Sequence, residues 1–155
     1  MRIVKYSNRI FDRVAPLLRE GTRWWGKEWR KEVLRIYSQL EGEAYVAEDN
    51  GRIIGTIFLK RQVRVLVIYF LAVTKKERKM GVGSSLVKFA EKIARKERRI
   101  LRVDVAKELE KNVNFYRKLG FKKCGQVRNF YIDGDEQIFL CKKPRRQNQV
   151  PNPSF

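Results

Sequence analysis

The sequence predicts an α/β domain with a mixed sheet flanked by about four helices. Three observations support this fold class. The chain has 155 residues, a length typical of a single domain. Hydrophobic residues make up 43% of it, which is enough for a sizeable core. Helical and strand periodicities also alternate along the chain, as in α/β domains.

The first half of the chain contains two helical segments and four strand segments. Residues 2–6 form a short strand, and apolar residues at helical spacing follow until Gly21 and again until Gly42. The period then changes to two. Two strands are joined by the hairpin turn Asn50-Gly51, and a long strand follows that is apolar enough to be buried on both faces. These three strands are expected at residues 44–48, 52–62 and 63–73.

The second half repeats the alternation after a basic loop. We expect a helix after Gly81, a strand over 100–105, and a short helix that ends at Gly120. A final hairpin joins strands 121–132 and 136–142 through Asp133-Gly134. We predict a domain over 1–143 and a flexible basic tail over 144–155, because the tail contains prolines and shows no periodicity.

The chain is strongly basic, with 36 Lys and Arg against 17 Asp and Glu and a net charge of +19. Such a charge favours polyphosphates, nucleic acid or acidic protein surfaces, and it argues against a polycationic acceptor. Two interpretations stay open, solvated helix faces and anion binding. The longest apolar run, 65–73, is shorter than the roughly 20 residues of a membrane span, and no signal peptide is visible. We therefore predict a cytoplasmic protein without membrane contact.

The sequence contains no histidine, which excludes Ser-His-Asp triads and histidine-based metal sites. The two cysteines, Cys124 and Cys141, are too few for a disulfide framework or a zinc site. We expect them to be reduced, inert thiols, and we expect no metal.

A glycine-containing loop, Arg78-Lys79-Met80-Gly81-Val82-Gly83, lies between the long apolar strand and a helix. A helix N-terminus presents unpaired N–H groups, and glycines allow a phosphate to approach the backbone. The loop fails the Walker pattern, because Ser84 follows Gly83 in place of lysine, and it lacks the third glycine of the dinucleotide fingerprint. A turn without any ligand is the alternative interpretation.

Two motifs together resemble the GNAT superfamily of N-acetyltransferases. One is Arg-x-x-Gly-x-Gly at residues 78–83, after an apolar strand and before a helix. The other is Asn-Phe-Tyr-Arg-Lys-Leu-Gly-Phe at residues 114–121. The resemblance implies a mostly antiparallel GNAT-like sheet and transfer of the acetyl group of acetyl-CoA to an amine, with CoA as co-product. It covers nearly the whole chain except the tail.

The resemblance also implies which residues hold acetyl-CoA. The pantetheine arm pairs with the end of the apolar strand, the pyrophosphate lies on the glycine loop, and the motif tyrosine points at the sulfur. An N–H of that strand polarises the thioester carbonyl, as in an oxyanion hole. The residues that match are Leu71, Ala72, Val73, Arg78, Lys79, Met80, Gly81, Val82, Gly83, Ser84, Asn112 and Tyr116. The family often has Asn seven residues before the tyrosine, where this chain has Leu109, so Asn112 is the candidate one turn before Tyr116.

Amine attack on a thioester needs an acid and a base. The resemblance makes Tyr116 the acid, and the alternative is a core aromatic. By position, Asp104 is the candidate base, and the alternative is a carboxylate that pairs with Arg102 or caps the next helix. Tyr69 is a weaker candidate for orienting a water.

The acceptor pocket of such folds implies a role for the connection between the first two helices. Trp24 and Trp25 lie there and are candidates for an aromatic wall or lid, with Trp24 preferred because it lies off the apolar stripe of the second helix. Trp29 lies on that stripe and is expected in the core. Tyr69 completes the predicted acceptor residues.

Three functions remain open at this point. The first is an N-acetyltransferase that acts on a protein N-terminus, a lysine or a small amine. The second is a nucleic-acid-binding module, and the third is a degenerate fold that binds CoA without catalysis. The charge also suggests contact with nucleic acid or the ribosome, and the protein is either a monomer or a homodimer.

Overall fold

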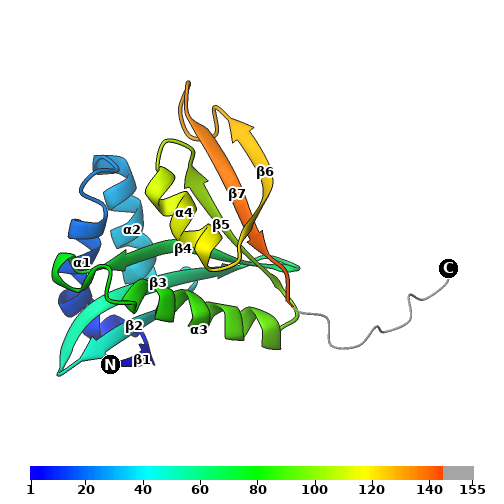
Figure 1. Cartoon of the computed structure of the whole chain (residues 1–155). Coiled ribbons are helices and arrows are strands. Elements are labelled where there is room, and N and C mark those ends of the chain that lie inside the picture. Colours follow the sequence, from blue (N-terminus) through cyan, green and yellow to red (C-terminus); the bar gives the residue numbers. More distant parts are fainter. Residues whose placement is uncertain (145–155) are drawn as a thin grey trace.

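The computed structural model describes residues 1–144 and contains one seven-stranded sheet with helices on both faces (Figure 1). The strand order is β1-β2-β3-β4-β5-β7-β6, and β4–β5 is the parallel pair among antiparallel neighbours. The predicted mixed sheet is therefore confirmed. The tail predicted over 144–155 lies outside the described residues, apart from Pro144.

The strands match the predicted order. They are β1 (Arg2–Lys5), β2 (Glu43–Asp49), β3 (Arg52–Arg61), β4 (Val65–Val73), β5 (Ile100–Ala106), β6 (Lys122–Arg128) and β7 (Glu136–Lys142). The long apolar strand begins at Val65 and not at residue 63, because Val63 is 93% exposed in the β3–β4 turn.

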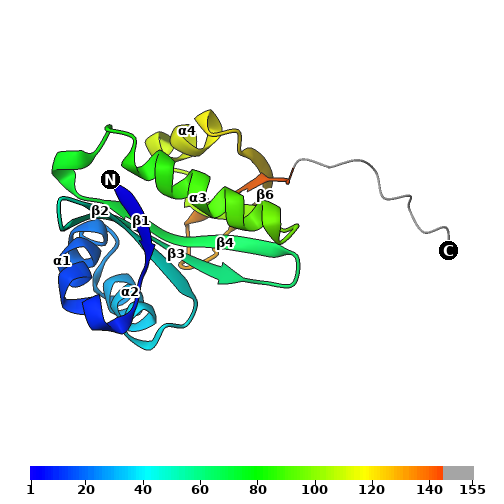
Figure 2. The same ribbon diagram turned by 90° about the horizontal axis from the view of Figure 1, so that it is seen from below.

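Four α-helices cover the sheet, two on each face (Figure 2). They are α1 (Phe11–Gly21), α2 (Lys27–Gln39), α3 (Val82–Lys96) and α4 (Glu110–Lys118), with short 3-10 turns at Asn8–Ile10 and Lys75–Glu77. Helices α1 and α2 pack over one core, centred on Tyr37 and Phe58. Helices α3 and α4 pack over the other, which contains Leu86 and Leu101. Burial of β4 on both faces is confirmed, because its side chains contribute to both cores.

A β-bulge interrupts β4 in its middle. Phe70 lies opposite Phe58 and Ile68 lies opposite Leu59, so Tyr69 is an extra residue. The bulge changes which side chains face each core, because a shift of one residue reverses the alternation of a strand. Parallel pairing of β4 with β5 also ends here, at Ile68 and Val103. The two strands therefore separate beyond the bulge.

The last hairpin differs from its prediction. Strand β6 ends at Arg128, and residues 129–135 form a loop in place of a strand that continues to residue 132. Asn129 takes a left-handed conformation with φ of 53°, and the Asp135 carboxylate accepts N–H bonds from Phe130 (2.6 Å) and Tyr131 (3.2 Å). These side-chain bonds satisfy backbone groups that a longer strand would have paired.

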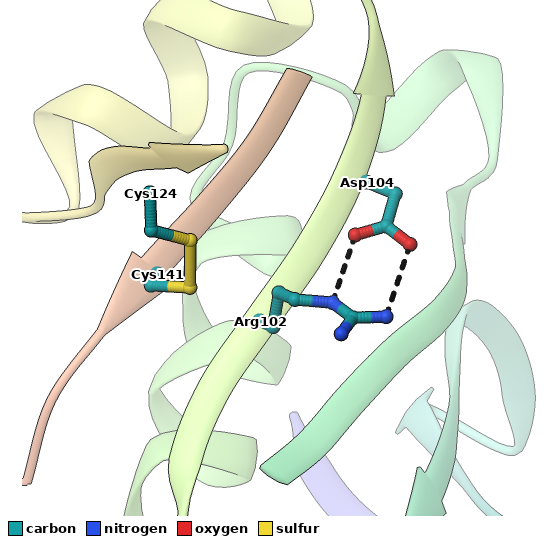
Figure 3. The surroundings of a disulfide bond; sticks show 4 residues. All are labelled: Arg102, Asp104, Cys124 and Cys141. Atoms are coloured by element: carbon teal, nitrogen blue, oxygen red, sulfur yellow. Dashed lines mark hydrogen bonds and ion pairs between the residues drawn. A yellow bond between two sulfur atoms is a disulfide. The ribbon is translucent and has the colours of Figure 1, made fainter. Parts of the chain in front are cut away.

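The expectation of reduced thiols is wrong. Cys124 and Cys141 form a disulfide between β6 and β7, with their Cα atoms 5.8 Å apart (Figure 3). A two-residue turn at 133–134 would have placed Gln126 opposite Cys141, whereas the register set by the longer loop, with Arg128 opposite Glu136, would place Lys123 there. A bulge between Lys123 and Gly125 then brings Cys124 within reach of Cys141.

Candidate active site

A cavity of about 610 Å³ occupies the place where β4 and β5 separate. Its walls come from α2, α4, β4, β5 and the β6–β7 loop. Of the predicted catalytic and acceptor residues, it brings together Asp104, Tyr116, Tyr69 and Trp25. These side chains come from four different parts of the chain, so the separation of the strands is what creates one site from them.

Tyr116 lies in the wall of the cavity and is 6% exposed. Its ring packs edge-on against Phe115 and Phe121, at centroid distances of 4.9 and 5.4 Å. Burial raises the pKa of its hydroxyl well above the usual range, so the group stays protonated at neutral pH. No described side chain or backbone group hydrogen-bonds to the Tyr116 hydroxyl, which leaves its proton available. The ring is thus both a core aromatic and a potential proton donor, and its two predicted roles are compatible.

Asp104 lies on β5, faces the cavity and is held by Arg102 (Figure 3). The Arg102 guanidinium donates from Nε to Oδ1 at 3.0 Å and from Nη2 to Oδ2 at 3.3 Å. The carboxylate is 15% exposed. Burial raises its pKa, and the charge and hydrogen bond of Arg102 offset part of that rise. The predicted ion pair is therefore present, and each oxygen retains a lone pair for a further hydrogen bond.

The glycine loop forms an open turn before α3. Lys79 and Gly81 have φ angles of 64° and 84°, and Gly81 is the N-cap of the helix. In residues 1–144, no backbone N–H from residue 78 to residue 84 donates a turn or loop hydrogen bond. A Cβ built on Gly81 meets no atom within 4 Å. A run of free N–H groups beside open space at a helix N-terminus suits a phosphate, so the residues present fit the coenzyme.

The Arg78 side chain forms polar contacts within the protein itself. Its Nε donates to the carbonyl oxygen of Val73 at 3.1 Å, and its Nη2 lies 3.5 Å from a carboxylate oxygen of Glu20. The guanidinium thus ties the loop to the end of β4 and to α1. We expect it to position the loop, while Lys75, Lys76 and Lys79 supply positive charge.

The predicted cofactor residues at the end of β4 divide between the two faces of the sheet. Leu71 lines the cavity, and Ala72 packs into the core under α1 and α2. Val73 packs beside Gly83, where an added Cβ would stand 3.6 Å from Val73 Cγ2. Asn112 also lines the cavity. At the helix start, Val82 is a buried core residue, whereas Met80 is 72% exposed.

Four aromatic rings form a continuous wall at one end of the cavity, where the sequence predicts that the acceptor binds. Trp29 is central, with centroid distances of 6.0 Å to Trp25, 5.6 Å to Tyr69 and 6.0 Å to Tyr131. Trp24 is 88% exposed and does not line the cavity, so the preference for Trp24 over Trp25 is not supported by its place. Trp29 packs only partly into the core and lines the cavity as well.

Several cavity residues were not among the predicted site residues. Glu28, Trp29, Tyr131 and Asp135 all line the cavity. Trp29 was missed because its place on an apolar stripe predicted a core residue. Tyr131 was missed because it was predicted to lie in a strand. The polar pair Asn129 and Asp135 flanking Phe130-Tyr131 was the available signal, because such side chains often hold turns together.

Comparison with known proteins identifies the class of protein to which this fold and site belong. The chain matches the acetyltransferase (GNAT) family over residues 11–121. It is 30% identical over 147 residues to an uncharacterised N-acetyltransferase of Methanocaldococcus jannaschii, and the match covers 92% of each chain. The chain therefore belongs to the GNAT family and is an acetyl-CoA-dependent acetyltransferase.

Two solved structures share the fold at low identity. The ribosomal-protein-S18-alanine N-acetyltransferase of Escherichia coli has a TM-score of 0.80 at 14% identity, with 97% of this chain and 98% of that chain covered. An aminoglycoside 6'-N-acetyltransferase complexed with coenzyme A has a TM-score of 0.76 at 20% identity, with 96% and 100% covered. In the described residues, no helix combines the length and the apolar character needed to cross a membrane.

Proposed function

We propose that this protein transfers the acetyl group of acetyl-CoA to a primary amine by direct attack of the amine on the thioester. The observation that carries this proposal is the cavity, whose lining includes both Tyr116 from α4 and Asp104 from β5. Acetyl-CoA bound there supplies an activated acyl group. The protein contributes binding, orientation and the two proton transfers.

The loop before α3 and the free edge of β4 would hold the coenzyme. The N–H groups of residues 78–84 are candidates for the pyrophosphate, with Lys75, Lys76 and Lys79 adding charge. Beyond Ile68, the edge of β4 that faces β5 has no strand partner. An extended amide-containing arm can pair with such an edge, as a peptide adds to a sheet.

Tyr116 and Asp104 carry the proton transfers in this proposal. The neutral Tyr116 hydroxyl donates its proton to the departing thiolate sulfur. The Asp104 carboxylate takes a proton from the acceptor ammonium, directly or through water, and the neutral amine that results attacks the thioester carbon. Arg102 keeps Asp104 ionised despite its burial, because its charge stabilises the carboxylate.

The test is a screen of amine acceptors by release of free thiol from acetyl-CoA, together with calorimetric titration of acetyl-CoA. The proposal expects binding of the coenzyme and thiol release that depends on one class of amine. A protein that binds acetyl-CoA but releases thiol with no peptide, lysine or small amine would be a degenerate binder. A protein that does not bind acetyl-CoA would contradict the proposal.

Contact with nucleic acid or the ribosome stays a prediction, and one surface favours it. Lys88, Lys92 and Lys96 form an exposed row along α3, each one helical turn from the next. In residues 1–144, none of the three has a carboxylate within ion-pair distance. A salt-dependent gel shift with RNA tests the prediction, since contacts to phosphates weaken steeply as salt rises. Cytoplasmic location and a monomeric or dimeric state also stay predictions.

A further inference from the structure

The charge that lines the cavity is opposite in sign to the charge of the whole chain. Glu28, Asp104 and Asp135 line the cavity, and no lysine or arginine side chain does so among the described residues. The chain as a whole has 36 basic residues against 17 acidic ones. The +19 net charge therefore describes the outer surface and does not extend to the acceptor.

The nearest cations are already engaged with protein groups. Arg102 donates to Asp104 and stands over the Phe139 ring at 5.1 Å, and Lys31 lies 3.0 Å from Glu28 on the surface of α2. Lys60 stands 3.9 Å from the centroid of the Tyr69 ring. None of the three lines the cavity.

Asp135 is the least neutralised of the three carboxylates. Its oxygens accept hydrogen bonds from the N–H groups of Phe130 and Tyr131 and from the Gln137 amide at 3.2 Å, and no described cation lies within ion-pair distance. Such bonds hold the loop and leave the negative charge in place. That charge then acts on any group bound in the part of the cavity that Asp135 lines.

The aromatic wall, like the carboxylates, favours a positively charged group in the cavity over a negatively charged one. The faces and edges of Trp25, Trp29, Tyr69 and Tyr131 enclose the acceptor end. An aromatic face attracts an ammonium group, and its apolar area binds a hydrocarbon body. A carboxylate or phosphate beside the amine would meet both the rings and the three acidic side chains unfavourably.

We propose that the cavity selects its acceptor as an ammonium ion with an apolar body and no negative charge beside the amine. This inference rests on the proposed acetyl transfer to an amine and narrows its substrate class. The net charge of the chain argues against a positively charged acceptor, whereas the charge that lines the cavity favours one. Asp135 is the main specificity-determining residue in this proposal, because its charge has no described ion-pair partner. Glu28 contributes less, because its side chain is 87% exposed and pairs with Lys31.

The experiment compares phenylalaninamide with phenylalanine, which carry a neutral amide and a carboxylate, respectively, next to the amine. One measurement is thiol release from acetyl-CoA. The other is the quenching of tryptophan fluorescence, which reports binding beside Trp25 and Trp29 without any turnover. We expect phenylalaninamide to be preferred by about tenfold or more in both, the effect of one like charge at close range. A peptide pair, Phe-Lys-Gly amide and Phe-Glu-Gly amide, tests the same charge preference at a chain terminus, where we expect the lysine peptide to be preferred.

Charge-neutral variants test the source of the preference. The double variant Glu28→Gln with Asp135→Asn keeps the shape of both side chains, and we expect the preference to fall to about twofold or less. Asp12→Asn is the matched control, because Asp12 is exposed on α1 about 14 Å along that helix from Gly21 and outside the cavity. The control should keep the full preference.

The outcomes separate this inference from the proposed function. Selective quenching by phenylalaninamide without thiol release would support the cation-selective cavity and contradict acetyl transfer to this class of amine. Equal or better use of phenylalanine, an unchanged preference in the double variant, or neither binding nor turnover of any probe would overturn the inference. The comparison of the two probes on the wild-type protein holds even if the double variant does not fold.

Discussion

At the scale of single residues, burial gives two ionisable groups in the cavity opposite tasks. The hydroxyl of Tyr116 becomes harder to ionise and stays a donor. Burial also raises the pKa of Asp104, and Arg102 limits that rise. Both effects come from the cost of placing a charge in a poorly solvated site. On α4 this cost keeps Tyr116 protonated, and on β5 it means that Asp104 needs the positive charge of Arg102 to stay ionised.

Replacing Tyr116 by Phe removes the proposed acid and leaves the packing intact. We expect kcat to fall by about 100-fold or more, the typical contribution of a positioned acid, while the affinity for acetyl-CoA stays the same. Steady-state thiol release and calorimetry measure the two quantities. Since no described group hydrogen-bonds to the Tyr116 hydroxyl, thermal stability should also be unchanged. Wild-type turnover in this variant would show that another group protonates the sulfur.

The acid side of the pH profile should report Asp104. Its raised pKa means that the carboxylate gains a proton, and loses its function as a base, at a higher pH than an ordinary aspartate does. Activity should therefore fall as pH decreases through that raised value. Replacing Arg102 by Leu removes the cation that lowers the pKa, so the decline should begin at higher pH. The measurement is kcat/KM against pH for both proteins, and a decline at the same pH in both would contradict the assignment.

At the scale of elements, two local irregularities make the site. The bulge at Tyr69 ends the pairing of β4 with β5, and the left-handed residues Lys79 and Gly81 turn the loop before α3. The glycines were visible in the sequence. The bulge could not be predicted, because the β-branched and aromatic residues of β4 form the pattern of one uninterrupted strand.

Gly81 and Gly51 provide a matched pair for testing the loop. Both have positive φ, 84° and 75°, and both face open space, but Gly51 lies in the β2–β3 hairpin. We expect Gly81→Ala and Gly51→Ala to lose a similar stability, about 1–2 kcal/mol, from the strained backbone. Only Gly81→Ala should weaken acetyl-CoA binding, by about tenfold, because its Cβ occupies the phosphate position. Denaturant titration and calorimetry measure the two effects, and equal acetyl-CoA affinities would exclude the loop as the coenzyme site.

At the scale of the whole molecule, the disulfide contributes to the stability of the fold. The Cys124–Cys141 bond joins the two strands at the end of the sheet that carry the loop over the cavity. It spans 17 positions of sequence, so it reduces the conformational freedom of the unfolded chain.

Removing the disulfide should destabilise the protein measurably. We expect the double variant Cys124→Ser with Cys141→Ser to lose about 3 kcal/mol of unfolding free energy, as for other loops of this length. Urea denaturation measures the loss, and a reducing agent should produce the same loss in the wild type and none in the variant. A wild-type protein that is indifferent to reductant would show that the bond contributes nothing to stability.

The sequence alone determined the fold class, the order of the strands and helices, and the two motifs of the family. Periodicity and glycine positions are local properties that the chain carries whatever surrounds it. Tyr116 and Asp104 could be selected in the same way, by motif and by position along the chain.

Which side chains share the cavity, and what charge they present there, depends on the tertiary structure. Tyr131 and Asp135 reach it through a loop whose register depends on long-range pairing, and the disulfide depends on a bulge in that same hairpin. Net charge is a sum over the chain and contains no information about position. A basic protein can therefore enclose an acidic site, because folding separates the carboxylates of the cavity from the lysines of the surface.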